Sequence, residues 1–125
     1  MCLIGKINID IYKCITNDIV TDEVIITDNQ IQHIIERHPN VYEHVIGFLG
    51  EAVAYPDYII RDKRPNTGLV IKKVQLEDKY VQLVLRVCTS KDSPGYKNSA
   101  LSCWEISESR LNNYLRNKTI LYRKV

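Results

Sequence analysis

The chain has 125 residues, which suits one compact domain, 1–125, and leaves no room for a second core. Its 45% hydrophobic and 26% charged residues exclude collagen-like, low-complexity and disordered chains. No apolar stretch approaches the ~18 residues of a membrane span, and Asn8 and Asp10 interrupt the first apolar run where a signal peptide needs continuity. We therefore expect a soluble, unprocessed protein with no membrane partner.

The cysteines show neither a disulfide framework nor a metal site. Cys2, Cys14, Cys88 and Cys103 form no C-x-x-C pair, and no histidine lies at zinc-finger spacing from them. A domain of this length buries enough surface to fold without covalent staples. The sequence therefore predicts free thiols, a reducing compartment and no metal ligands.

Charge is distributed unevenly along the chain, although the formal net charge is only +2. Residues 1–60 contain nine acidic and three basic side chains, a net charge of −6, whereas residues 61–125 contain fourteen basic and six acidic side chains, a net charge of +8. Such asymmetry is typical of proteins with an anionic partner, nucleic acid first and an acidic protein next. Two solvated faces that balance each other are the alternative.

The N-terminal half reads as short strands followed by helices. Ile7, Ile9 and Ile11 alternate as on one side of a strand, and a second short strand is expected around 24–26. Thr27 and Gln30 have the spacing of a capping box, and the apolar residues after them keep helical spacing. Pro39 bends the chain at His38 and begins a second helix.

The C-terminal half reads as mostly β. Strands are expected at 58–60, 69–74, 80–88, 99–106 and 119–125, with a turn at 77–79 and a short helix capped by Ser107. Within 80–88 the apolar residues fall on one face and the polar residues on the other, so only one face of the sheet needs covering. We predict an α+β fold, with N-terminal helices packed on one face of an antiparallel sheet of four or more strands.

The densest polar group runs from His33 to Pro39. On a helix, His33 and Arg37 lie four positions apart on one face, and His38 points closer to the core. Imidazole transfers protons near neutral pH and a guanidinium holds an oxyanion, which favours a catalytic interpretation. In the structural interpretation His38 caps the helix break and His33 is a surface residue.

Two further groups carry polar side chains into the predicted sheet. Lys72 and Lys73 are adjacent in an apolar strand, so one of them must face the core side and snorkel, pair with a carboxylate or reach a cleft. Asn98 and Ser99 begin a strand, where they either bind phosphate oxygens or close a turn. The sequence has no P-loop, G-x-G-x-x-G, G-x-S-x-G or H-E-x-x-H motif, which disfavours nucleotide-cofactor and metalloprotease chemistry.

The order of these motifs resembles a known family. It begins with Ile26-Thr27 and His33-Ile34-Ile35-Glu36-Arg37-His38-Pro39, continues with Tyr55-Pro56-Asp57-Tyr58-Ile59 and Leu69-Val70-Ile71-Lys72-Lys73, and ends with Asn98-Ser99-Ala100-Leu101-Ser102. This pattern is similar to the phage-type barnase-EndoU-colicin-RelE-like (BECR) nucleases, over residues 24–123, with 1–23 as an N-terminal strand or arm. Ser102 stands where related sequences commonly have a threonine.

The resemblance implies a metal-independent, toxin-like ribonuclease without a cofactor, cytoplasmic or delivered into a target cell, and linked to phage or mobile elements. In that hypothesis the catalytic side chains are His33, Arg37, His38 and Lys72, and those that bind the RNA substrate are Lys73, Arg86, Asn98, Ser99, Ser102 and Tyr122. A cognate immunity or antitoxin protein is a further expected partner. The competing hypotheses are a non-catalytic interaction domain and an inactive relative that still binds RNA.

Overall fold

A computed structural model of the chain describes residues 2–37, 46–74 and 79–124. Its strands are β1 (Cys2–Lys6), β2 (Glu23–Ile26), β3 (Tyr58–Arg61), β4 (Thr67–Val74), β5 (Lys79–Arg86), β6 (Asn98–Ser107) and β7 (Ile120–Arg123). Its helices are α1 (Ile9–Tyr12), α2 (Asp28–Arg37), α4 (Leu49–Ala54) and α5 (Glu108–Asn117), with a 3-10 turn, η1, at Ile46–Phe48. The fold is therefore α+β, as predicted.

The strands form one sheet in the order β1-β2-β6-β5-β4-β3-β7. The pairing is antiparallel except between β2 and β6, which run parallel with Val24 opposite Asn98 and Ile25 opposite Ser99. The prediction of an antiparallel sheet was therefore wrong at this pair. Alternation marks a strand but not its neighbour, and β2 meets β6 only after the intervening chain has folded back.

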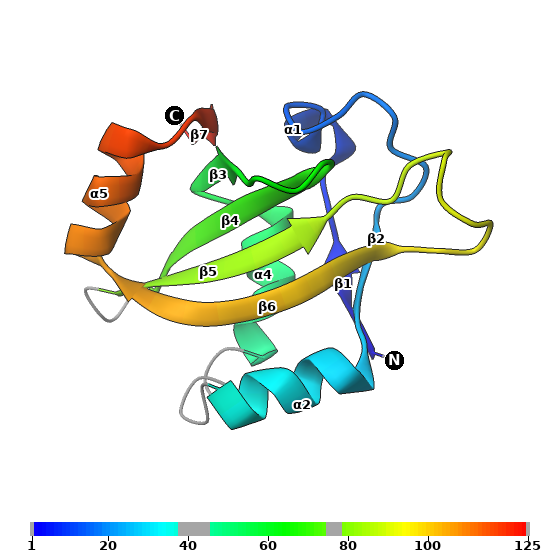
Figure 1. Cartoon of the computed structure of the whole chain (residues 1–125), viewed down its shortest axis with the longest axis horizontal. Helices are drawn as coiled ribbons and strands as arrows, with labels where there is room; N and C mark the ends of the chain where they lie inside the picture. Colours follow the sequence, from blue (N-terminus) through cyan, green and yellow to red (C-terminus); the bar gives the residue numbers. More distant parts are fainter. Residues whose placement is uncertain (1, 38–45, 75–78, 125) are drawn as a thin grey trace.

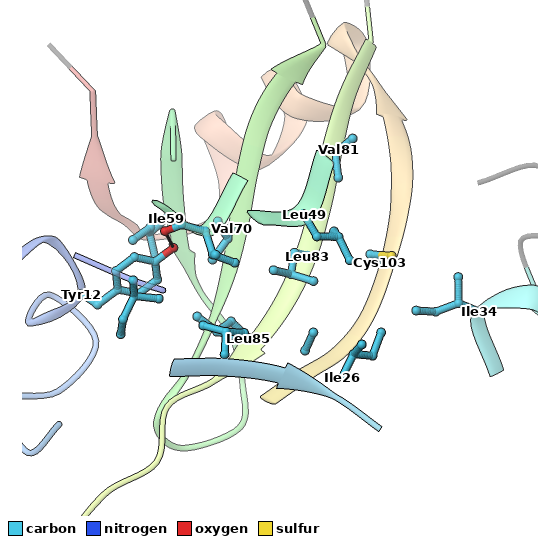
Figure 2. Close-up of a cluster of buried hydrophobic side chains, with 14 residues drawn as sticks. Tyr12, Ile26, Ile34, Leu49, Ile59, Val70, Val81, Leu83, Leu85 and Cys103 are labelled. Carbon is cyan, nitrogen blue, oxygen red and sulfur yellow. Dashed lines mark hydrogen bonds between the residues drawn. The ribbon is translucent and has the colours of Figure 1, made fainter. Parts of the chain in front are cut away.

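Both faces of the sheet carry hydrophobic clusters. The main cluster includes Val70, Val81 and Leu83 of the sheet together with Tyr12 of α1, Ile34 of α2 and Leu49 of α4 (Figure 2). The other face packs under α5 and contributes Ile60, Leu69, Ile71, Val84 and Ile106 to a second cluster with Leu111 and Tyr114. The expectation that only one face needs covering was therefore wrong. The second face is polar at its margins but apolar where α5 crosses it.

The N-terminal segment is a strand followed by a short helix, not one alternating strand. Asn8 caps α1, because its Oδ1 accepts a hydrogen bond of 3.1 Å from the Asp10 N–H. Tyr12 is fully buried, and its hydroxyl donates to the Val53 carbonyl at 2.7 Å. The alternating isoleucines suggested a strand here, but the Asn8 side chain caps a helix instead.

The predicted start of α2 is confirmed. Thr27 N–H donates to Gln30 Oε1 at 3.0 Å and Gln30 N–H donates to Thr27 Oγ1 at 3.2 Å, which is a reciprocal capping box. Figure 1 shows α2 running alongside β6. The predicted bend at His38-Pro39 and the turn at Glu77-Asp78 lie outside the described residues, and α4 occupies the later part of the second predicted helix.

The C-terminal elements follow the predictions closely. Ser107 caps α5, with its Oγ accepting from the Arg110 N–H at 3.1 Å, and β7 follows the helix.

All four cysteines are free thiols, and burial raises the pKa of Cys103 to about 11. Among the described residues no helix has the length and apolar character needed to cross a bilayer.

Candidate functional site: a cleft between α2, β6 and α5

A cleft of about 480 Å³ lies where α2, β6 and α5 meet. Figure 1 shows α2 on one side of β6 and α5 rising from the C-terminal end of the same strand. The lining side chains come from all three elements and are His33, Arg37, Ser102, Trp104, Glu105, Ile106 and Arg110. The cleft therefore joins residues from the acidic half of the sequence to residues from the basic half.

Helix α2 presents His33 and Arg37 together. These side chains lie one turn apart and are exposed, while Ile34 between them is fully buried in the main cluster. The N-terminal end of α2 is tied to β6, because Ser99 Oγ donates to Gln30 Oε1 at 3.3 Å. Anchoring at both the cap and Ile34 holds the His33/Arg37 face toward β6.

Strand β6 forms the floor of the cleft. β2 pairs with it only at Asn98 and Ser99, so within the described residues the outer edge of β6 beyond Ser99 has no strand partner. Ser102 and Trp104 lie opposite Val84 and Gln82 of β5, on the face that carries α5. The cleft therefore lies between α2 and an edge of β6 that no described strand covers.

Glu105 faces the other way along β6. It pairs with Val81, which belongs to the main cluster, and its carboxylate lies 3.5 Å from Lys79 Nζ. The Glu105 side chain is 25% exposed. Its place in the cleft lining puts a carboxylate beside the imidazole and guanidinium of α2.

Arg110 enters the cleft from the first turn of α5. Its Nε donates to the Tyr114 hydroxyl at 3.3 Å, and its guanidinium lies 5.8 Å from the centre of that ring. The hydrogen bond raises the pKa of Arg110. Together with Arg37, Arg110 gives the described lining of the cleft two guanidinium groups and one carboxylate, which is itself paired with Lys79, so the field of these residues attracts anions.

Three of the predicted site residues meet in this cleft: His33, Arg37 and Ser102. His38 lies outside the described residues. Lys72 is not part of the lining; it shares the core side of β4 with Val70 and pairs with Asp57 Oδ1 at 3.7 Å, with its side chain 8% exposed. Pairing with a carboxylate is one of the three outcomes predicted for this lysine from the sequence.

The remaining predicted substrate contacts are spread over the molecule. Arg86 makes a bidentate ion pair with Asp92, at 2.8 and 3.1 Å. Tyr122 is half-buried on β7 and packs against the main cluster. Lys73 is exposed near the end of β4 and lines a separate pocket.

Asn98 and Ser99 hold the fold together. Asn98 is fully buried and uses its amide on three backbone groups, accepting from Cys88 N–H and donating to the carbonyls of Thr21 and Glu23. The Ser99 hydroxyl is the anchor of α2 described above. The Asn98 amide therefore closes the loop between Cys88 and β6, whereas the Ser99 hydroxyl joins β6 to α2.

Sequence reasoning missed Trp104, Glu105 and Arg110. Trp104 is the one tryptophan of the chain, which was a compositional signal. Arg110 falls in the first helical turn, where the helix dipole favours acidic side chains. An arginine at this position was therefore a second signal of a functional residue. Glu105 carried no such signal, because strand alternation predicts which face of the sheet a residue lies on but not which cleft it lines.

No group of three or more His, Cys, Asp and Glu side chains with metal-binding geometry occurs in residues 2–37, 46–74 and 79–124.

Comparisons with curated proteins and with solved structures find no match. A comparison with protein families matches residues 3–123 to PBECR2, described as phage-Barnase-EndoU-ColicinE5/D-RelE like nuclease2. The match includes β1 and α1 as well as the segment from 24 onward that carries the sequence resemblance. The chain therefore belongs to the PBECR2 family of nuclease-like proteins.

Proposed function

We propose that the protein is a metal-independent endoribonuclease that cleaves RNA by attack of the ribose 2′-OH on the adjacent phosphorus. The observation that carries this proposal is the meeting of His33 with Arg37 and Arg110 in one open, cationic cleft. An imidazole beside two guanidiniums supplies proton transfer and anion stabilisation at one place. Membership of a nuclease-like family supports the same reaction class.

The reaction needs two proton transfers. As the 2′-oxygen forms its bond to phosphorus, a base removes its proton, and as the P–O5′ bond breaks, an acid protonates the departing 5′-oxygen. Among the described residues that line the cleft, the His33 imidazole and the Glu105 carboxyl are the groups that can accept and donate these protons. The products carry a 2′,3′-cyclic phosphate and a 5′-hydroxyl.

The two arginines stabilise the negative charge that accumulates on the phosphoryl oxygens. Each guanidinium presents several N–H donors in a plane, which matches the geometry of non-bridging phosphate oxygens. Arg110 replaces Lys72 among the proposed catalytic cations, because the Lys72 ammonium is engaged with Asp57. Ser102 lines the same cleft, which supports a role for its hydroxyl as a donor to the phosphate.

Trp104 gives the cleft an aromatic wall on which an unpaired base can stack. Such a wall favours single-stranded RNA, because bases in a duplex are already stacked on one another. In a toxin-like role, a cognate immunity or antitoxin protein would block the reaction by covering this cleft. The acidic surface of such an inhibitor would complement Arg37 and Arg110.

The test is incubation of the purified full-length chain with total RNA and with a short oligoribonucleotide in excess EDTA. We expect cleavage to persist in EDTA, to yield a 2′,3′-cyclic phosphate detected by mass spectrometry, and to stop when the scissile nucleotide is 2′-deoxy. His33→Ala and Glu105→Gln should each abolish most of it. Unchanged cleavage in the His33→Ala/His38→Ala double variant, or strict dependence on a divalent ion, contradicts the proposal. RNA binding without cleavage would favour the inactive RNA-binding relative.

A further inference from the structure

A second concave surface, separate from the cleft, lies near the ends of β4 and β5. It has a volume of about 250 Å³ and is lined by Asp57, Tyr58, Lys73, Tyr80 and Lys124. None of these residues lines the His33 cleft. We call this surface the tyrosine-lysine pocket.

The register of the sheet places two tyrosines around one lysine. Tyr80 lies directly opposite Lys73, and Tyr58 lies opposite Ile71, two residues earlier on β4. Ile71 packs under α5, so all four side chains share the α5 face. The tyrosines stand on the strands either side of β4, and these two strands are about 10 Å apart.

Among the described residues, the lining of the pocket carries more positive than negative charge. Asp57 is the one acidic residue in this described lining, and its carboxylate accepts the Lys73 N–H at 2.7 Å and lies 3.7 Å from Lys72 Nζ. The buried Lys72 therefore compensates Asp57 from the opposite face of the sheet. The Lys73 and Lys124 side chains are exposed, so their ammonium charges are available to a ligand.

Neighbouring contacts hold the pocket in shape. The Lys124 N–H donates to the Asp57 carbonyl at 2.9 Å, which fixes the chain after β7 against the start of β3. The Arg123 guanidinium lies 5.7 Å from the centre of the Tyr58 ring. A third cation thus stands at the margin of the pocket, stacked on one of its aromatic walls.

We propose that the tyrosine-lysine pocket binds a nucleotide segment of single-stranded RNA that flanks the bond cleaved in the His33 cleft. The inference rests on the proposed function. Ammonium groups contact phosphates, and tyrosine rings stack on bases whatever their sequence, so cations interleaved with aromatic side chains suit a single strand. An acidic peptide would contact the lysines but would not use the aromatic walls that the pocket provides.

The experiment measures RNA affinity in the full chain carrying His33→Ala, so that cleavage cannot intervene. Fluorescence anisotropy with a long single-stranded oligouridylate gives Kd over a range of salt concentrations. Lys73→Gln combined with Lys124→Gln should raise Kd at least tenfold. The slope of log affinity against log salt should fall by about 1.4, because each single-strand phosphate contact contributes about 0.7. The charge-matched control is Lys13→Gln combined with Lys91→Gln, both exposed and outside the pocket, and it should change Kd less than threefold.

The aromatic part is tested with Tyr80→Leu and Tyr80→Phe. Loss of stacking should raise Kd about tenfold in the leucine variant, while the phenylalanine variant, which keeps the ring, should bind as tightly as the parent. Inorganic polyphosphate, which has the charge without bases, should bind more weakly than RNA and respond to the lysine changes only. Polyphosphate binding as tight as RNA binding would show that the rings add nothing and would overturn the inference.

The outcomes separate this inference from the proposed function. A Kd that the lysine changes leave unaltered, or that the control raises equally, overturns the inference whether or not the chain cleaves RNA. Absence of RNA binding overturns it as well. Failure of the wild-type chain to cleave RNA, with the expected Kd changes intact, leaves the pocket as a binding site and contradicts only the nuclease proposal.

Discussion

The Asn98 side chain joins the start of β6 to Cys88: its Oδ1 accepts a hydrogen bond of 2.8 Å from the Cys88 N–H. Its Nδ2 donates to the carbonyls of Thr21 and Glu23 at 2.8 and 3.0 Å. One fully buried side-chain amide thus forms hydrogen bonds with three backbone groups from two separate segments, at Thr21 and Glu23 and at Cys88. This arrangement keeps β2 against β6 where the sheet changes from antiparallel to parallel pairing.

Asn98→Ala should lower the free energy of unfolding by about 3 kcal/mol. It removes the hydrogen-bond partner of up to three buried backbone groups, and each buried group left without a partner costs ~1–3 kcal/mol. Urea denaturation measures the change. The matched control is Asn112→Ala, on the exposed surface of α5, which should stay within about 0.5 kcal/mol of the parent. A loss below about 1 kcal/mol for Asn98→Ala would contradict the structural role assigned to this side chain.

Gly50 of α4 allows the helix to touch the backbone of β1. A Cβ added there would lie 2.7 Å from the Ile4 carbonyl oxygen, which is backbone and has little freedom to move. Gly50→Ala should therefore lower the free energy of unfolding by about 1–3 kcal/mol, although alanine is favoured over glycine in a helix by about 1 kcal/mol. Gly47→Ala is the control, since nothing lies within 4 Å of its added Cβ. Equal stabilities of the two variants, compared by thermal unfolding, would show that α4 does not press on β1.

The ion pair of Arg86 with Asp92 predicts a specific acid response. The Arg86 hydrogen bonds, followed by the Thr89 N–H, hold the pKa of Asp92 at about 2, below its ordinary value of 3.8. Between these values the unfolded chain binds more protons than the folded chain, so stability rises with pH. The contribution is complete above about pH 4 and disappears as the pH falls through about 2.

Asp92→Asn should consequently lower the urea midpoint at neutral pH, and the gap to the parent should narrow as the pH falls from about 4 toward 2. Asp10→Asn is the control, because this carboxylate is 88% exposed and its pair with Lys13 at 3.4 Å is a surface contact. A gap for Asp92→Asn that stays constant with pH would mean that Arg86 does not perturb Asp92.

The cleft arginines should affect the rate of cleavage more than the affinity for RNA. Arg37→Ala and Arg110→Ala should each reduce kcat by about 10²–10³, the typical loss for one group that stabilises a developing oxyanion. Arg116→Ala, an exposed arginine of α5 outside the cleft, should cleave like the wild type. Single-turnover cleavage of a short oligoribonucleotide separates the rate from binding. Similar losses in all three variants would indicate a general effect of charge and not catalysis in the cleft.

Local signals in the sequence predicted much of the fold. The Thr27/Gln30 capping box starts α2, and Ser107 caps α5, because these side chains satisfy backbone N–H groups within their own turn. Strand alternation in 80–88 identified the core side of β5. The same alternation failed at Ile9 and Ile11, where the Asn8 cap outweighed it.

Part of the candidate site was equally local. His33 and Arg37 share a face because four helical positions bring side chains into register, whatever the helix packs against. The functional roles of Lys72 and Asn98 depended on which groups they contact. Those groups are Asp57 for Lys72 and the backbone of Thr21, Glu23 and Cys88 for Asn98, and all of them lie beyond the reach of local sequence patterns.

The sequence by itself determined the class of fold, the first residues of the capped helices α2 and α5, the helical face that pairs an imidazole with a guanidinium, and the family. Only the tertiary structure decided that β2 runs parallel to β6, that α5 covers the second face, and that Trp104, Glu105 and Arg110 complete the cleft. The physical reason is the sequence distance over which each interaction acts. Helix caps and hydrophobic periodicity involve residues a few positions apart, whereas strand order and the walls of the cleft depend on which segments, distant in sequence, bury their apolar surfaces against one another.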